Sequence, residues 1–300
     1  MISCQKEEPG GGIVSEESIL LEHFYHIKLV YVNRELFPSS WEKIPHSHEQ
    51  CELFIHLQGE IDIYAEKNMY HLSGGEIRIY SAGELHCGTI ARQQHMEWYQ
   101  ISIPPEFRAC PEAEKLMELF VNREYGVGNV FLSRHQERIA ELISEAFDWY
   151  RKEKPLWECY CASAVLQILC LLNNAGDRVE RMLQSNAAFQ KILGVIHSNY
   201  QSLETIQDIC ELTHYSASYI NRLFRENINI SAYQFLLGKK LDEAKKALRT
   251  GMRVTEACET AGFGSYSNFI TLFRKKLGIT PKKFEQQVRG AGEPEESSEV

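Results

Sequence analysis

Two similar stretches in the last third of the sequence constrain the fold most. Each has a short run with apolar residues at helical spacing, a break, a serine at a helix N-cap position, and a second amphipathic run that ends in Leu-Phe-Arg. They span residues 206–225 and 254–274. Such a unit can lay its second helix in the major groove of DNA, and chance is a poor explanation for two copies. The pattern therefore predicts a DNA-binding protein.

The charge is unevenly distributed along the chain. The 300 residues carry a formal net charge of −9, which by itself argues against binding to a polyanion such as DNA. Residues 187–290, however, contain 15 Lys and Arg against 9 Asp and Glu, whereas residues 1–186 contain 17 against 28. The C-terminal third therefore has the basic character of a DNA-binding domain, and the acidic remainder predicts a partner that is not a polyanion.

The first unit has an apolar side and a polar side. Its predicted core residues are Ile206, Ile209, Leu212, Ile220, Leu223 and Phe224. Ser216 is the predicted cap of the second helix. The residues predicted to face outward on that helix are Ala217, Ser218, Asn221, Arg222 and Arg225. Asn and Arg have the donor geometry for base edges and phosphates, so this face is the candidate DNA contact.

The second unit repeats this arrangement. Its predicted core residues are Ala257, Ala261, Phe263, Phe269, Leu272 and Phe273, and Ser265 is its predicted cap. The predicted outward residues are Tyr266, Ser267, Ile270, Thr271, Arg274, Lys275 and Lys276. Between the units, residues 232–249 form a predicted helix that could hold the two recognition helices roughly 34 Å apart, one turn of DNA. The alternative is ordinary helical-bundle sequence, which the two matching serines and the basic charge disfavour.

The N-terminal half has a different pattern. From about residue 24 to 104, short alternating runs such as 60–64, 76–80 and 97–103 are separated by Gly, Pro and Asn, which predicts a β-sandwich or barrel. The period then becomes helical, with helices predicted over residues 112–121, 133–154 and 156–173. The last of these is apolar almost all round, so we expect it to be buried on most sides, either within its own domain or against a second chain.

Histidines gather in the predicted barrel. His46, His48 and Glu52 have even spacing and so share one face of a strand, and His86 lies near the end of a second strand. Three imidazoles and a carboxylate are a ligand set for a divalent transition metal such as Zn, Mn, Ni or Fe. The alternative is that the histidines only line a pocket or hydrogen-bond locally.

The same barrel could hold a small organic effector. The predicted effector-binding residues are His46, His48, Glu52, Phe54, Tyr64, Tyr80 and His86. Aromatic and polar neighbours (Trp41, Arg78 and Trp98 among them) would suit a sugar or a small carboxylate.

The sequence resembles a known family at both ends. Residues 188–284 resemble the DNA-binding domain of AraC/XylS transcriptional regulators, through Ser216, Tyr219-Ile220, Arg222-Leu-Phe224 and Tyr233 in the first unit, and Ala261-Gly-Phe263, Phe269, Phe273-Arg-Lys-Lys-Leu-Gly-Ile-Thr-Pro281 and Phe284 in the second. The resemblance implies base contacts by Ser218, Asn221, Arg222, Tyr266, Ser267, Ile270 and Thr271. Because Ile270 is apolar and Ser267 is short, we expect the first unit to dominate sequence choice. Residues 44–89 resemble the two cupin motifs, with His46, His48, Glu52 and His86 at the metal-ligand positions and Ser81 and Ile90 in place of the usual Pro and Asn.

These observations predict an α+β chain of two domains: a cupin-like β-barrel with a helical segment, and an all-α domain with two helix-turn-helix units. The predicted boundaries are a flexible N-terminus (1–18), a ligand-sensing barrel (19–110), a helical dimerisation or connector segment (111–174), a linker (175–186), the DNA-binding domain (187–288) and an acidic disordered tail (289–300). Nine cysteines without paired spacing, most in apolar surroundings as at Cys170, predict reduced core thiols of a cytosolic protein.

The leading hypothesis is a bacterial transcriptional regulator in the cytoplasm, associated with the nucleoid when bound to DNA and controlled by a small molecule in the barrel. Its predicted partners are duplex promoter or operator DNA, the effector and a second copy of itself, with no membrane; on family resemblance it is an activator, which would add RNA polymerase. No catalytic residues or certain cofactor are predicted. The alternatives are a metal-dependent cupin enzyme or metal sensor fused to a DNA-binding domain, and a regulator whose barrel serves only assembly.

Overall fold

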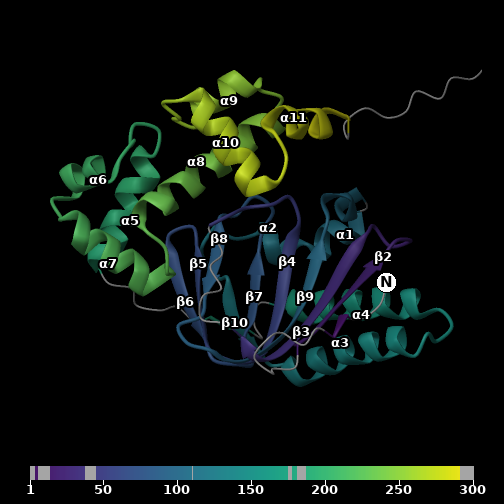
Figure 1. Ribbon diagram of the computed structural model, residues 1–300. Helices are drawn as coiled ribbons and strands as arrows, with labels where there is room; N and C mark the ends of the chain where they lie inside the picture. The colour runs from purple at the N-terminus through teal and green to yellow at the C-terminus, as the bar shows by residue number, and fades with distance from the viewer. Residues whose placement is uncertain are drawn as a thin grey trace, which may run out of the picture. The chain divides into compact units, whose positions relative to one another are not determined.

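The computed structural model describes residues 4–5, 14–37, 45–109, 111–174, 178–180 and 187–290 (Figure 1). The chain forms two compact units, one of residues 1–43 and 47–185 and one of residues 44–46 and 186–300. The first is rich in β-strands and carries helices, and the second is helical, which confirms the predicted α+β fold class. Trp41, most of the predicted linker and the acidic tail after residue 290 lie outside the described residues.

Two antiparallel sheets form the first unit. The larger has the strand order β1-β2-β3-β9-β4-β7-β10-β11 and the smaller the order β6-β5-β8. The strands are β1 (Cys4–Gln5), β2 (Val14–Leu21), β3 (Ile27–Phe37), β4 (Cys51–Gln58), β5 (Ile61–Ala65), β6 (Asn68–Leu72), β7 (Ile77–Tyr80), β8 (His86–Thr89), β9 (Gln94–Ile103), β10 (Val130–Ser133) and β11 (Arg178–Glu180). The predicted strands at 60–64, 76–80 and 97–103 are confirmed as parts of β5, β7 and β9.

Alternation along the strands gives the larger sheet two different faces. Leu53 and Ile55 of β4 belong to a core shared with the helices, whereas Phe54 belongs to a second core with residues of the smaller sheet, such as Ile63. The even-numbered residues of β4 therefore point into the space between the two sheets. This interior face carries Glu52 and His56.

The first unit contains a 3-10 helix η1 (Pro105–Ala109) and helices α1 (Pro111–Leu116), α2 (Glu118–Val121), α3 (Gln136–Arg151) and α4 (Trp157–Leu172). Figure 1 shows α3 and α4 side by side, and both pack on the helix-facing core of the larger sheet. The single helix predicted over 112–121 is wrong, because Met117 turns into the core and separates α1 from α2. The helix predicted from residue 133 begins later, because Val130–Ser133 pairs with β7 as β10.

Within a single chain the predicted burial of helix α4 is met only in part, and one cysteine prediction is wrong. Helix α4 has the predicted extent, but one side of it is exposed, including Ser163, Leu166 at 41% and Cys170. Cys170 is therefore not a core thiol, although Cys51 and Cys161 are buried as expected. The core-facing stripe of α4 is wide, yet the packing against α3 and the sheet covers only one side of the helix.

Some predicted boundaries fall inside regular structure. Residues 14–18, assigned to the flexible N-terminus, form the first half of β2 and pair with β3. Residues 178–180, assigned to the linker, form β11 and pair with β10. Strand β11 is an edge strand whose partner lies far earlier in the chain, whereas β2 lies between β1 and its neighbour in sequence β3. Among the described residues, no helix is both long and apolar enough to cross a membrane.

The second unit is built from seven described helices, which are α5 (Ala187–Asn199), α6 (Ile206–Thr213), α7 (Ala217–Ile228), α8 (Ala232–Arg249), α9 (Val254–Thr260), α10 (Tyr266–Leu277) and α11 (Pro281–Gly290). Both predicted caps are confirmed: Ser216 Oγ accepts the Tyr219 N–H at 3.3 Å and Ser265 Oγ accepts the Asn268 N–H at 3.3 Å. The predicted bounds of the central helix α8 are confirmed as well.

Most of the predicted core of this unit is confirmed, although Ile206, Phe263 and Leu272 are only half-buried. Ile209, Phe224, Phe269 and Phe273 are fully buried, whereas Leu212 is 49% exposed. Helix α6 ends one residue later, at Thr213, and it is Thr213 that lies on the buried side, four residues after Ile209. The last apolar residue of a short helix was therefore assigned to the wrong side.

Candidate functional sites

The outward face of α7 carries an exposed arginine with weak contacts. Arg222 Nη1 lies 3.1 Å from Glu226 Oε1, and its guanidinium carbon lies 5.2 Å from the centre of the Tyr219 ring. Exposed pairs of this kind contribute little to stability, so Arg222 can exchange them for a phosphate or a base edge. Ser218 and Arg225 are exposed on the same helix.

Asn221 has a structural contact that limits its predicted role. Its Oδ1 accepts the backbone N–H of Ala232 at 3.2 Å, at the first turn of α8. The side chain thereby satisfies one of the unpaired N–H groups at that helix start. In this arrangement Nδ2 remains available for DNA, and a two-bond contact to adenine would require Oδ1 to release the Ala232 N–H.

The outward face of α10 holds most of the residues predicted there. Tyr266 is 48% exposed, and Ser267, Thr271, Arg274 and Lys275 are exposed as well. Ile270 is the exception: it is half-buried and packs against the core that contains Phe269 and Phe273. The predicted base contact by Ile270 is therefore not supported, because its side chain leans into its own domain.

Sequence reasoning missed Asn268 on α10. Its side chain is exposed and lines a groove of about 550 Å³, together with Thr271 and Lys275 of α10 and Tyr233 and Lys240 of α8. Asparagine is one of the residue types that read base edges, and this one follows the Ser265 cap by three residues. That position after the cap is the sequence signal that identifies Asn268.

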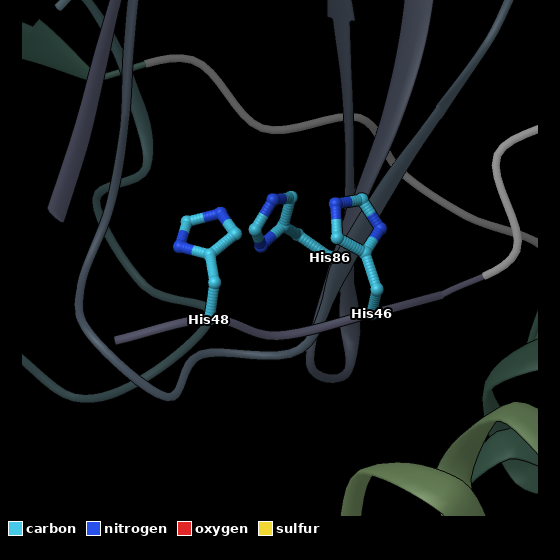
Figure 2. A group of neighbouring side chains, drawn as sticks. All are labelled: His46, His48 and His86. Atoms are coloured by element: carbon cyan, nitrogen blue, oxygen red, sulfur yellow. The ribbon is translucent and has the colours of Figure 1, made fainter. Parts of the chain in front are cut away.

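Three histidines come together in the first half of the chain. Figure 2 shows the rings of His46 and His48, from one segment, gathered with the ring of His86 at the start of β8. One ring nitrogen from each lies within 4.8 Å of the other two. The rings of His48 and His86 meet edge to face at 5.0 Å, and Tyr80 stacks on His86 at 3.8 Å.

Glu52 lies against two of these rings. Its Oε2 is 3.1 Å from His48 Nε2 and 3.5 Å from His86 Nε2, and Gln100 Nε2 donates to its Oε1 at 2.7 Å. Burial alone would raise the pKa of Glu52, but the hydrogen bonds and charge interactions with His48 and His86 outweigh burial and hold that pKa well below its usual range. The carboxylate is therefore ionised and directed at the imidazoles.

The other ring nitrogens have backbone partners. His48 Nδ1 lies 2.9 Å from the carbonyl oxygen of Gln50, and His86 Nδ1 lies 2.9 Å from that of Glu84. A carbonyl can only accept, so each Nδ1 donates, and Nε2 is the ring nitrogen that faces Glu52 and could bind a metal in place of a proton. Metal-binding histidines are commonly oriented by such a bond. The predicted set of His46, His48, Glu52 and His86 is thus brought together, and its donors fit a divalent transition metal.

The remaining predicted effector residues are divided between two faces. Phe54 and Tyr80 belong to the core between the sheets, and their rings meet edge to face at 6.0 Å. Tyr64 alternates with Ile63 and Ala65, which face that core, so Tyr64 points to the opposite side, where its strand partners are Met69 and Cys87. The prediction that Tyr64 contacts an effector inside the barrel is therefore wrong.

Comparisons with known proteins match both halves of the chain. The AraC-like ligand binding domain family matches residues 38–168, and a helix-turn-helix domain family matches residues 209–287. The probable transcriptional regulator LumQ of Photobacterium leiognathi is 21% identical over 253 residues, which are 82% of this chain and 94% of that protein. The uncharacterized HTH-type transcriptional regulator YtdP of Bacillus subtilis is 31% identical over 99 residues, or 33% of this chain and 13% of that protein.

The first curated relatives share only part of their length with this chain, which covers between 13% and 40% of each. Among solved structures, ToxT from Vibrio cholerae O395 is 12% identical, with 88% of this chain and 98% of that chain covered, at a TM-score of 0.35.

Proposed function

We propose that this chain, which belongs to the AraC family of transcriptional regulators, binds specific duplex DNA through α7 and α10 and changes transcription in response to a small molecule in its β-rich domain. The observation that carries the proposal is the pair of serine-capped helices, each with an apolar side in the core and an exposed polar side. The basic excess of residues 187–290 supplies the attraction to phosphates.

Arg222→Ala tests the DNA-binding face of α7. We expect this change to weaken DNA binding by about 1–3 kcal/mol, because one contact to a base or a phosphate is lost. If the lost contact is to a phosphate, the slope of the logarithm of the binding constant against the logarithm of the salt concentration should also become shallower by about one. The measurement is fluorescence anisotropy with the full-length protein and a duplex selected by that protein from a random-sequence library, at several salt concentrations.

Glu226→Ala is the matched control for Arg222→Ala. It breaks the same 3.1 Å ion pair but leaves the arginine in place, so affinity should stay within about twofold of wild type or rise. An equal loss of affinity in both variants would mean that the ion pair, and not a contact to DNA, maintains binding. Unchanged binding in Arg222→Ala would exclude this face of α7.

The β-rich domain is the proposed sensor. A sugar or small carboxylate bound between the sheets would favour one arrangement of the protein over another, which requires a coupling free energy of about 1–3 kcal/mol. We further propose activation of transcription, hence contact with RNA polymerase, in a bacterial cytoplasm and without an enzymatic step. The exposed side of α4, with Ser163, Leu166 and Cys170, is the surface proposed to meet a second copy of the chain.

A divalent metal sensor is the second candidate, favoured by the three gathered imidazoles. His46, His48, Glu52 and His86 would hold the ion, which would supply a Lewis acid for an effector oxygen. We expect about one zinc, manganese, nickel or iron per chain in protein purified without chelators, lost in Glu52→Ala and in His48→Ala. Elemental analysis measures this directly.

His71→Ala is the control for metal binding. His71 is paired with Asp62 at 2.7 Å on another pair of strands, and its removal should leave the metal content unchanged. Metal-free wild-type protein, or metal that survives in Glu52→Ala and His48→Ala, would remove the metal from the function and leave the histidines as part of the pocket wall.

A further inference from the structure

A buried arginine lies between the sheets without an ion-pair partner in direct contact. Arg78 of β7 is 5% exposed, and its guanidinium carbon lies 3.9 Å from the centre of the Phe54 ring. In the part of the chain that the structure describes, its Nε has no hydrogen-bond acceptor and the guanidinium forms no ion pair. The charge of Glu52 on the same interior face acts on Arg78 from a distance, but its carboxylate is engaged by His48, His86 and Gln100. A buried guanidinium without a direct ion pair is costly for a fold, so its retention points to a partner from outside the chain.

A buried acceptor lies on the same face. His56 is two residues beyond Phe54 on β4, and Phe54 is the direct strand partner of Arg78. His56 Nε2 donates to the carbonyl oxygen of Gly59 at 2.7 Å, which leaves Nδ1 as the acceptor, and Nδ1 has no donor among the described residues. Burial, helped by the charge of Arg78, lowers the pKa of His56 to about 4, so the ring is neutral at physiological pH.

The surrounding side chains set the character of a ligand. Trp98 is the strand partner of His56 and Gln100 that of Phe54, so an indole and an amide flank the two polar groups. Trp98 is 7% exposed and belongs to the apolar core between the sheets. The face therefore offers one cation for bidentate contact, one acceptor for a hydroxyl and an aromatic surface for a short carbon skeleton.

We propose that Arg78 and His56 recognise a small hydroxycarboxylate, whose carboxylate pairs with the Arg78 guanidinium and whose hydroxyl donates to His56 Nδ1. This inference rests on the proposed function, since it names the chemical class of the effector in the β-rich domain. A neutral sugar would leave the arginine unpaired, and a simple carboxylate would leave His56 Nδ1 unpaired. An organic acid with a hydroxyl near the carboxylate satisfies both.

The test uses the full-length protein with four probes: lactate and gluconate, which have both groups, propionate, which lacks the hydroxyl, and glucose, which lacks the charge. Calorimetric titration should show binding of at least one hydroxycarboxylate, weaker binding of propionate and none of glucose. Arg78→Met should weaken binding of the hydroxycarboxylate on the order of 10- to 100-fold, because a charge-assisted bond is lost. His56→Phe should weaken it as well but leave propionate within about threefold of its wild-type affinity.

Arg92→Met is the control, because Arg92 is exposed and paired with Glu60 at 3.0 Å; it should bind like wild type. The thermal midpoint without ligand adds a second readout. If Arg78 serves to bind a ligand, the thermal unfolding midpoint of Arg78→Met should equal or exceed that of wild type, because a buried charge without an ion pair is removed. If Arg78 serves the fold, the midpoint of the variant should be lower. Glucose binding as tightly as gluconate, no hydroxycarboxylate binding, or a lowered midpoint would each overturn the proposal.

DNA binding separates this inference from the proposed function. Arg78→Met should bind the selected duplex like wild type without added acid but fail to respond to the acid. If the wild type binds the acid and never binds DNA, the proposed function fails while the anion site stands. If it binds DNA and no acid, the anion site fails alone.

Discussion

Arg123→Met is expected to destabilise the first unit by about 3–5 kcal/mol, because it leaves the buried carboxylate of Glu84 without its counter-charge. The Glu84 side chain is fully buried and that of Arg123 is 9% exposed. Both carboxylate oxygens meet the guanidinium: Nη1 donates to Oε1 at 3.0 Å, and Nη2 donates to Oε2. Methionine fills a similar volume, so the loss is electrostatic rather than a cavity.

The effect is large because this pair holds two loops together. Glu84, between β7 and β8, also accepts the backbone N–H groups of Ser81 at 2.8 Å and Gly126 at 2.6 Å and the side-chain amide of Asn129 at 2.9 Å. Arg123 donates to the carbonyl oxygen of Val127 at 3.0 Å. Without the arginine, the loop that leads into β10 loses its anchor beside His86.

Urea denaturation followed by tryptophan fluorescence measures this loss. The four tryptophans of the chain all lie within residues 1–186, so the signal follows the first unit alone. Arg138→Met is the control, since Arg138 and Glu141 form an exposed pair at 3.2 Å whose loss should cost less than about 1 kcal/mol. If the two variants unfold at the same urea concentration, the buried pair is not the anchor inferred here.

The second unit was predictable from sequence because its signals are local. A serine cap, helical spacing and a glycine turn all lie within a few residues of each other. These signals located the two helix-turn-helix motifs and helix α8 without any knowledge of tertiary contacts. Leu212 was misassigned for the opposite reason. In an eight-residue helix two sides can look apolar, and only the neighbouring helices decide which one is buried.

The first unit was less predictable because its decisive contacts join distant residues. Strand β10 has four residues, lies between helical stretches and pairs with β7 about fifty residues earlier. Glu84 and Arg123 are 39 residues apart, and nothing in either neighbourhood identifies the other. Tyr64 is different: its alternation with Ile61 and Ile63 was visible in the sequence, and counting it would have placed the ring on the outer face.

Gly262→Ala is expected to destabilise the second unit by about 2–5 kcal/mol and to abolish DNA binding at protein concentrations that saturate the wild type. Gly262 has φ of +75°, and a Cβ there would lie 2.7 Å from the Gln201 carbonyl carbon and closer still to two other backbone atoms of Gln201. Backbone atoms cannot turn away, so the turn before α10 and the segment before α6 must separate. Circular dichroism at 222 nm during urea denaturation should report the loss, with tryptophan fluorescence unchanged.

Gly278→Ala distinguishes crowding from backbone strain. Gly278 ends α10 with φ of +73°, almost the same conformation as Gly262, but nothing lies within 4 Å of a Cβ built there. The free energy of unfolding of Gly278→Ala should fall only by the cost of placing an alanine in the left-handed backbone conformation, about 1–2 kcal/mol. The DNA affinity of this variant should be unchanged. The segment at Gln201 also donates its side-chain amide to Thr260 O at 2.9 Å, and Lys240 of α8 donates to Gly262 O. Close approach at Gly262 therefore joins the start of the first helix-turn-helix motif to the turn of the second motif, and equal losses in the two variants would contradict that role.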